Sequence, residues 1–522
     1  MGNGRTITAR DIARAGKESL PTLIPQLVKQ VASGSVEAKE AAIESIRSLA
    51  AQNHGEHART LFEAKAVGPV VKLLSEGSAK AQAASAAALH SIMSDQAAHQ
   101  QAVMEAGGAA VLVRLVKTGS PKVQEAAASA LSAIQDDVSH QKLIIQAGCI
   151  ANLIALLQSG SDAAKAYSCQ ALANAAAFDE DAQNAIAKLG GVPLVVKLLS
   201  LGAAQTPAAR AIMKLADNNQ AVQAALTEAG SIPPLLSLLT GPNPEAQAQA
   251  ASAISAMVRG DIGNQAAVAQ AGGMGPLIAL LSSNRRGNGP VMSQAMSALA
   301  EMAGGNRENQ DAIARQGGIK PLVRLIEPSE AGRDVQAHAA LAIMAITRHN
   351  IDNQTAVVDL GGISHLSALM KQSAHSEVKA EVAGALWSLS EAPELKVAIS
   401  RSGTIAPLVE LLGSGGPRAR NHAANALASL GHQDAENQVK ITQMLIDLLS
   451  TGAGEAQTRA VHALRALIDE NPSANQVIAE AGNPALLVQL LQSGVPCIST
   501  TEPQPHSSVG MQHTKTLQIT RS

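Results

Sequence analysis

A glycine that recurs every 40 to 45 residues is the feature that most limits what this chain can fold into. The intervals are 41, 42, 40, 42, 45, 44 and 42 residues up to Gly403, and weaker copies of the unit open at Lys65 and Lys440. A fixed period of roughly twenty to fifty residues is typical of a solenoid, whose units stack in one dimension. The recurring glycines are Gly107, Gly148, Gly190, Gly230, Gly272, Gly317, Gly361, Gly403 and Gly482.

The end of one unit shows how the first helix of a repeat is delimited. A short helix is predicted over residues 264–270, with the Asn264 side chain as its N-cap. Gly272 and Gly273 follow it, and glycine readily takes the left-handed conformation that ends helices. The recurring glycine is therefore expected to separate the first helix from the second.

Two further helices complete the unit. Pro233 and Pro234 mark the start of a second helix, where a residue without an N–H group is tolerated. A longer third helix is predicted over residues 245–258, and its apolar positions are nearly all small. Each repeat should thus hold a short, a medium and a long helix.

The motifs of these helices resemble those of the armadillo-repeat family. Asn309-Gln310 stands before the first helix, Gly317-Gly-Ile-Lys-Pro-Leu-Val opens the second, and Val123-Gln-Glu-Ala-Ala-Ala-Ser-Ala-Leu131 belongs to a third. The resemblance implies an all-α fold, a right-handed α-solenoid superhelix of about eleven armadillo repeats with three helices each. It covers residues 20–494, between a head over 1–19 with a capping helix and a tail over 495–522 that we expect to be disordered.

Composition limits the classes of function. A formal net charge of −2 argues against a general nucleic-acid binder, which needs a basic face. Three cysteines in so long a chain predict no disulfide framework and a reducing compartment. The sequence contains no run of eighteen uninterrupted apolar residues, so no membrane-spanning helix is predicted. We expect a cytoplasmic protein, with the nucleus and a peripheral membrane as alternatives.

The head of the chain offers one route to a membrane. Met1-Gly2-Asn3-Gly4-Arg5-Thr6 fits the pattern for N-myristoylation of Gly2, and the alternative is a frayed terminus. One myristoyl chain binds a membrane only marginally, so a second signal would be needed. Membrane contact is therefore expected only if Gly2 is acylated. An insertion over residues 284–290 is a second candidate for recognition, with tolerated drift as the alternative.

The resemblance also implies where a ligand would bind. In the family the third helices line a concave groove, and nuclear-import receptors carry a Trp and, four residues later, an Asn on successive third helices. Only Asn174 keeps the family residue here, and no Trp does. The remaining polar-to-basic patch is Gln170, Asn174, Arg210 and Lys214, and its amides and cations suit an extended peptide with acidic side chains. The alternative is four solvated surface residues.

No arrangement of residues points to catalysis, a cofactor or a metal. His54-Gly-Glu-His57 lacks a third ligand at useful spacing, and Cys149 and Cys169 are expected to be buried thiols. Trp387, Tyr167, Phe62 and Phe178 are expected to pack against neighbouring helices.

The sequence therefore predicts a non-catalytic adaptor or scaffold that binds extended peptide segments of other proteins in its groove. The alternatives are a myristoylated, membrane-tethered armadillo adaptor of the vacuole type, a nuclear-transport receptor, and the substrate-binding subunit of a ubiquitin ligase.

Overall fold

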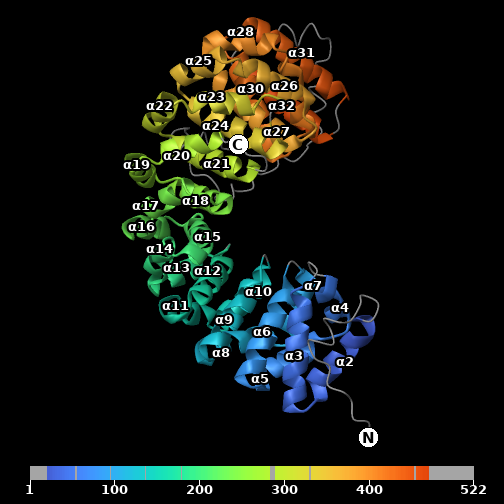
Figure 1. The fold of residues 1–522 in the computed structure, drawn as a ribbon. Coiled ribbons are helices and arrows are strands. Elements are labelled where there is room, and N and C mark those ends of the chain that lie inside the picture. The colour runs from blue at the N-terminus through green and yellow to red at the C-terminus, as the bar shows by residue number, and fades with distance from the viewer. Residues whose placement is uncertain are drawn as a thin grey trace, which may run out of the picture. The chain divides into compact units, whose positions relative to one another are not determined.

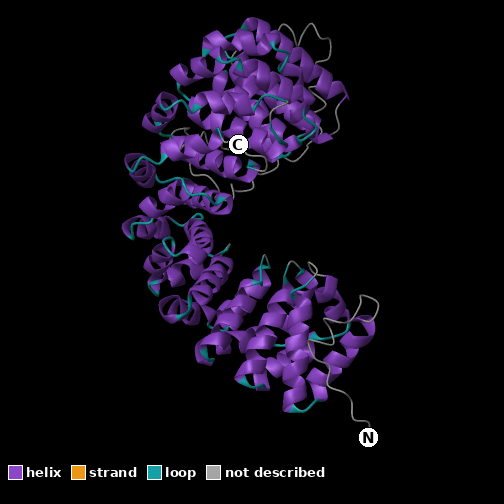
Figure 2. Ribbon diagram, viewed as in Figure 1, coloured by secondary structure: helices purple, strands orange, loops and turns teal. Residues whose placement is uncertain are grey.

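A computed structural model describes residues 20–468, except 53–55, 95, 136, 178, 283–287, 329–330 and 452–453. Every regular element in the described residues is a helix (Figure 2). The chain divides into two compact units, unit 1 over Met1–Leu238 and unit 2 over Leu239–Ser522, and helix α17 (Ile232–Leu239) crosses their border. The head, the tail, the last predicted half-repeat and most of the insertion lie outside the described residues.

Unit 1 repeats the predicted order of three helices (Figure 1). Its first helices are α4 (Glu56–Glu63), α7 (Ala97–Glu105), α10 (Val138–Gln146), α13 (Glu180–Lys188) and α16 (Gln220–Glu228). Its second helices are α2 (Leu20–Ser33), α5 (Val67–Glu76), α8 (Gly108–Thr118), α11 (Cys149–Ser159), α14 (Gly191–Leu198) and α17. Its third helices are α3 (Val36–Ala50), α6 (Ala79–Met93), α9 (Pro121–Ser132), α12 (Asp162–Ala176) and α15 (Gln205–Ala216), the last preceded by the 3₁₀ turn η3 (Gly202–Ala204).

Unit 2 continues the same pattern. Its first helices are α19 (Ile262–Gln270), α22 (Arg307–Arg315), α25 (Ile351–Asp359) and α28 (Pro393–Arg401). Its second helices are α20 (Met274–Leu281), α23 (Ile319–Leu325), α26 (Gly362–Gln372) and α29 (Ile405–Ser414). Its third helices are α18 (Pro244–Val258), α21 (Gly289–Ala303), α24 (Arg333–Thr347), α27 (Ser376–Leu389), α30 (Pro417–Gly431) and α32 (Gly454–Ile468), and a single helix, α31 (Ala435–Thr451), lies between the last two.

The repeat boundaries confirm the prediction with two corrections. The N-cap of α19 is Asp261, whose carboxylate accepts from the Asn264 N–H, so Asn264 lies inside the helix and is not its cap. The first and second helices are also nearly equal in length, with nine residues in α19 and eight in α20, against fifteen in α21. The third helix is therefore the one element that is clearly long.

The two glycines of the Gly-Gly motif have different roles. Gly361 has a φ of +82°, in the left-handed region, and the equivalent Gly272 has +78°. Gly362 is helical, and a Cβ atom there would lie 2.5 Å from Val357 Cγ1 and 2.7 Å from the Val357 carbonyl oxygen. Gly273 is likewise right-handed, with a φ of −66°, so the prediction of a left-handed Gly273 is wrong. The first glycine turns the chain and the second lets two helices approach closely.

The two weaker copies of the unit differ from each other. Lys65 takes the left-handed conformation itself, with a φ of +58°, so a repeat boundary persists there without glycine. The copy predicted to open at Lys440 has no such boundary, because α31 continues through this residue as one helix of seventeen residues. The first and second helices of that repeat have fused, since no glycine interrupts them.

Third helices of successive repeats pack on one another through small side chains. In unit 2, α18 packs on α21, α21 on α24, α24 on α27 and α27 on α30. Ala250, Ala251 and Ala253 of α18 are fully buried, and Ala248 is half-buried. A core of alanines lets helix axes come close, which explains how a chain with 1% aromatic residues can bury its interior.

The Asn-Gln motif explains how helix ends are satisfied. Asn264 Nδ2 donates to the Met257 carbonyl at 3.0 Å, and Asn353 Nδ2 donates to the Ile346 carbonyl at 3.1 Å, each seven residues back. In unit 1, His99 takes the asparagine position, and its Nδ1 lies 2.7 Å from the Ile92 carbonyl oxygen. The first helix thus satisfies carbonyls at the C-terminus of the preceding third helix, which lack intrahelical partners.

The glutamine of the motif joins neighbouring repeats. Gln310 Nε2 donates to the Ala303 carbonyl at the end of the preceding third helix, α21, at 3.4 Å, and to the Ala345 and Arg348 carbonyls at the end of the following one, α24, at 2.9 and 3.2 Å. Asn350 Nδ2 then donates to Gln310 Oε1 at 3.1 Å. Gln183 in unit 1 does the same with the Lys214 carbonyl at 2.9 Å. We call this series of inter-repeat hydrogen bonds the amide ladder.

Lys396 replaces the ladder glutamine in one repeat. Its Nζ donates to the His432 carbonyl at the end of the following third helix, α30, at 2.6 Å, and the residue is only 7% exposed. Burial lowers the pKa of Lys396, and the nearby Asp434 acts in the opposite direction. A cation therefore stands where the other repeats use a neutral amide.

No single described helix is both long and apolar enough to cross a membrane. Two helix pairs reach that length only together, Val138–Gln146 with Cys149–Ser159 and Gly191–Leu198 with Gly202–Ala216, and they are bent by 76° and 113°.

Candidate functional site

The predicted patch lies on α12 and α15, two third helices of unit 1 that pack against each other. Gln170 and Asn174 are four residues apart on α12, and Gln170 Nε2 donates to Asn174 Oδ1 at 3.0 Å. Arg210 and Lys214 have the same spacing on α15, and both are half-buried. The spacing of four places each pair on one helix face.

Asn174 is engaged inside the stack. It is 6% exposed, and its Nδ2 donates to the Ser132 carbonyl at 3.1 Å and to the Ile134 carbonyl at 2.9 Å, both in the preceding repeat. Both protons of its amide are therefore used within the protein. Asn174 Oδ1 accepts the hydrogen bond from Gln170, whereas Gln170 Oε1 receives no hydrogen bond from the described residues.

Arg210 carries the clearest unsatisfied group of the patch. Its Nε is buried and has no hydrogen-bond acceptor among the described residues. A buried donor without an acceptor costs free energy, and such groups call for a specific explanation. One turn along α15, the Lys214 carbonyl accepts from Gln183 of the ladder.

A second cluster surrounds Trp387 on the third helices of unit 2. The Arg348 guanidinium carbon, at the end of α24, lies 4.1 Å from the centre of the Trp387 ring on α27. The His422 ring on α30 lies 6.3 Å from the Trp387 ring, with 37° between their planes. Trp387 does contact neighbouring helices as predicted, but it is half-buried and keeps a polar environment. Tyr167 and Phe62 are also half-buried, and Phe178 lies outside the described residues.

Glu381 lies on the same helix as Trp387, α27, and its side chain is nearly enclosed. Its side chain is 7% exposed, and its Oε2 accepts from Arg418 Nη2 of α30 at 2.9 Å. Burial raises the pKa of Glu381 to about 7, while Arg418 lowers it and Glu377 raises it further. Burial also lowers the pKa of His422, against the hydrogen bond that joins its Nδ1 to the Ala380 carbonyl, and Arg418 and Arg348 lower it further.

The sequence alone does not reveal this second cluster. The Arg348 guanidinium and the Trp387 and His422 rings lie 39 and 35 residues apart in sequence, and the family pattern places its Trp at position 384, which is glycine here. A Cβ atom at Gly384 would lie 2.6 Å from Met344 Sδ and 2.8 Å from His422 Nδ1. The glycine thus makes room for the histidine, which only the packing of three repeats reveals.

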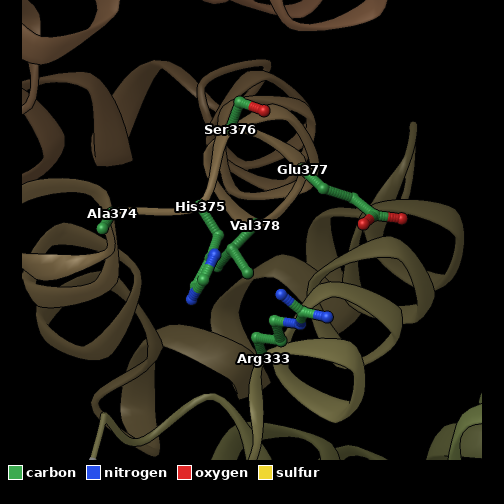
Figure 3. Close-up of a pocket in the computed structure, with 6 residues that line it drawn as sticks. All are labelled: Arg333, Ala374, His375, Ser376, Glu377 and Val378. Carbon is green, nitrogen blue, oxygen red and sulfur yellow. The ribbon is translucent and has the colours of Figure 1, made fainter.

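A pocket of about 320 Å³ opens where α27 begins (Figure 3). Arg333 comes from the first turn of α24, and the other lining residues are Ala374, His375, Ser376, Glu377 and Val378. Arg333 pairs with Asp334 at 3.2 Å, and the Glu377 carboxylate lies on the same rim. The pocket therefore gathers charges of both signs and favours no ligand class.

The remaining candidate groups have structural surroundings. Cys149 and Cys169 are buried as predicted, and burial raises the pKa of each thiol to about 12. His57 Nδ1 lies 3.3 Å from the Leu49 carbonyl oxygen, while His54 lies outside the described residues. Within the described ranges, no group of three or more His, Cys, Asp or Glu residues is placed to hold a metal ion. Gly2 and Cys497 also lie outside those ranges.

Comparisons with known proteins agree with this geometry. The Armadillo/beta-catenin-like repeat model matches residues 97–134, 218–258 and 350–391. A stretch of 94 residues is 34% identical to Plakophilin-3 of Mus musculus and, equally, to Plakophilin-3 of Homo sapiens. The match covers 17% of this chain and only 12% of the length of each relative. The crystal structure of an engineered protein is similar with a TM-score of 0.65 and 31% identity, over 78% of this chain and 98% of the engineered one.

Tandem three-helix repeats joined by an amide ladder define an α-solenoid. The Gly-Gly, Asn-Gln and third-helix motifs and the matched repeat model specify which solenoid this is. The chain belongs to the armadillo-repeat family.

Proposed function

We propose that this chain is a non-catalytic, cytoplasmic adaptor or scaffold, and that the third helices of unit 1 bind an extended peptide segment of a partner protein. The armadillo repeats and the similarity to Plakophilin-3 support protein interaction in general. The observation that carries the specific proposal is the buried Arg210 Nε without an acceptor among the described residues.

The chemistry of the patch suits a peptide with an acidic side chain. A carboxylate that reaches Arg210 satisfies its Nε, and a charge-assisted hydrogen bond of this kind is among the stronger ones. Lys214, one turn further on α15, adds a second positive charge. Gln170 Oε1 accepts from a peptide N–H, while Asn174 holds Gln170 in place through its own Oδ1. The amide thus fixes the peptide backbone and the cations select its side chains.

Charge reversal tests this proposal. The variant Arg210→Glu/Lys214→Glu should lose a defined set of partners in affinity purification with mass spectrometry, and titration calorimetry with a recovered partner should show the loss of binding. The matched control is Lys188→Glu/Lys197→Glu, which makes the same charge change at exposed sites on α13 and α14. Identical partner lists for all three chains, with unchanged helicity, would reject the site.

The membrane-tethered alternative depends on Gly2 and stays a prediction. Incorporation of labelled myristate into the wild-type chain, and not into Gly2→Ala, would establish it. The transport-receptor alternative would need a Trp ladder, and the amide of Asn174, the one family residue retained, is engaged by Ser132 and Ile134.

A further inference from the structure

Unit 2 carries a surface that combines two arginines, a half-buried tryptophan and a buried carboxylate. It is formed by α24, α27 and α30, which pack on one another in that order. Arg348 lies against the Trp387 ring, His422 lies beside that ring, and Arg418 pairs with the buried Glu381. We call these five residues the Trp387 surface. Glu377, close enough to raise the pKa of Glu381, is a further acidic group near this surface.

Several hydrogen-bond donors of this surface have no partner among the residues that the structure describes. The Arg348 guanidinium forms no ion pair or hydrogen bond with the described residues, and it contacts Trp387 only through its face. The Trp387 Nε1–H has no acceptor in the described part of the chain. Arg418 is 57% exposed and uses one nitrogen, Nη2, for its bond to Glu381. A guanidinium can donate five hydrogen bonds in a planar fork, so most of this capacity is open.

Glu381 occupies part of the surface that an external carboxylate would use. Its carboxylate comes from inside, between α27 and α30, and engages a single nitrogen of Arg418. Arginine binds a carboxylate best through two parallel bonds, so the existing contact is incomplete. A carboxylate arriving from solvent can take the remaining nitrogens of Arg418 and the whole fork of Arg348.

We propose that the Trp387 surface binds an extended acidic segment of a partner protein, and that Glu381 is an internal competitor for Arg418. The carboxylates of the segment pair with Arg348 and Arg418, and the Trp387 Nε1–H donates to a peptide carbonyl. This inference rests on the adaptor function proposed above, but it concerns unit 2 and residues that the unit 1 patch does not share.

Charge complementarity selects this occupant over the chain's own ends. Residues 495–522 contain one acidic residue, Glu502, against Lys515 and Arg521. Residues 1–19 contain Asp11 and Glu18 against four lysines and arginines. Neither segment offers the repeated carboxylates that the surface would pair. A nucleic acid would bring enough negative charge, but single strands are held by several stacking aromatics, and Trp387 is the only tryptophan in the chain.

Helix spacing sets the length of the segment. Packed helices lie about 8–10 Å apart, so three third helices span about 20 Å between the outer axes. An extended chain rises about 3.3 Å per residue, and six or so residues cross that distance. A probe of about twelve residues therefore covers the surface with a margin at each end.

The probe is a fluorescein-labelled peptide of about twelve residues that alternates Glu and Ala, with a Gln-for-Glu peptide as its neutral control. Fluorescence anisotropy with the full-length chain should show binding of the acidic peptide, weakened by salt because exposed charges are screened. The variants Arg348→Gln and Trp387→Leu should bind it about tenfold more weakly, as expected for loss of a close charge pair. The control Arg324→Gln, at an exposed site on α23, should not change the affinity.

The variant Glu381→Gln should change the affinity for the acidic peptide in the opposite direction. Removal of the internal negative charge weakens the hold on Arg418, so the acidic peptide should bind several-fold more tightly, while a purely structural role predicts no gain. No binding of the acidic peptide, equal binding by all variants, or weaker binding by Glu381→Gln would overturn the proposal. The proposal would also be overturned if an oligothymidylate bound in a way that depends on Arg348 and Trp387 while binding of the acidic peptide did not depend on them.

The result also separates the two binding proposals. If Arg210→Glu/Lys214→Glu abolishes peptide binding and the unit 2 variants do not affect it, the Trp387 surface is refuted and the unit 1 site stands. If the dependence is reversed, the Trp387 surface stands and the unit 1 site falls.

Discussion

Glu381→Gln should stabilise the protein in a pH-dependent way. The carboxylate is 7% exposed and has one ion-pair partner, Arg418, which is itself 57% exposed. Burial therefore dominates and raises the pKa of Glu381 to about 7, against an ordinary 4.5. Glutamine keeps the shape and can accept the Arg418 hydrogen bond through its Oε1 without carrying charge.

The direction of the pH dependence follows from whether the folded or the unfolded state binds the Glu381 proton more tightly. The folded protein holds the Glu381 proton up to about pH 7, while the unfolded chain loses it near 4.5. Between these values the folded state loses stability as pH rises, and above pH 7 the full penalty applies. The difference between about 7 and 4.5 corresponds to about 3 kcal/mol, which is the largest gain expected from Glu381→Gln at pH 8. Below pH 4.5 the wild type and the variant should be equally stable.

Trp387 provides a local assay, since it is the only tryptophan and lies on the same helix as Glu381. Urea unfolding followed by its fluorescence should give the variant a higher midpoint than the wild type at pH 8, and nearly the same midpoint at pH 4.5. Glu394→Gln, at an exposed site on α28, is the matched control and should show no such difference. An equal difference between variant and wild type at both pH values would refute the reasoning.

Four further changes test the fold. Gln310→Leu leaves buried carbonyls of two repeats without donors and should lower the free energy of unfolding by roughly 3 kcal/mol, whereas Gln372→Leu, exposed at the end of α26, should have little effect in urea titrations. Gly362→Ala should lose about 2 kcal/mol through the contact with Val357, and Gly332→Ala, with open space around its Cβ position, should melt like the wild type. Lys396→Gln should preserve the bond to the His432 carbonyl, and Lys396→Met should be less stable by about 1 kcal/mol in the same titration. The Cys149 and Cys169 thiols, with pKa values of about 12, should react with a thiol reagent at pH 8 only after urea is added, as peptide mapping by mass spectrometry would show.

The fold could be predicted because its main determinants are local in sequence. The glycine period, the prolines at 233 and 234 and the small residues of 245–258 each specify a helix boundary or a packing face. Gly361 shows this directly, since only a local conformation is needed for the turn. The cap of α19 was misassigned to Asn264 because Asp261, three residues earlier, is an equally good capping residue by type.

The candidate binding surfaces are less predictable because they depend on neighbours tens of residues away in sequence. The Asn-Gln motif is visible in the sequence, but the acceptors of Gln310 at the end of α24 depend on how the helices pack. Arg348 and Trp387 meet across two third helices, and Gly384 makes room for His422 only in the folded stack. Asn174 illustrates the same limit, because its family position suggested a ligand contact and its amide instead joins two repeats.

The amide ladder has a consequence for how such a chain can change its length. Most repeats present a glutamine or equivalent donor on one side and carbonyl acceptors on the other, as Gln310 and the Ala345 carbonyl show. Tandem duplication of one repeat would therefore create a junction whose polar groups are already matched, and precise excision of one repeat would restore such a junction. The copy number of repeats can drift during evolution at low energetic cost, whereas the two terminal repeats must each complete one side of the ladder by other means.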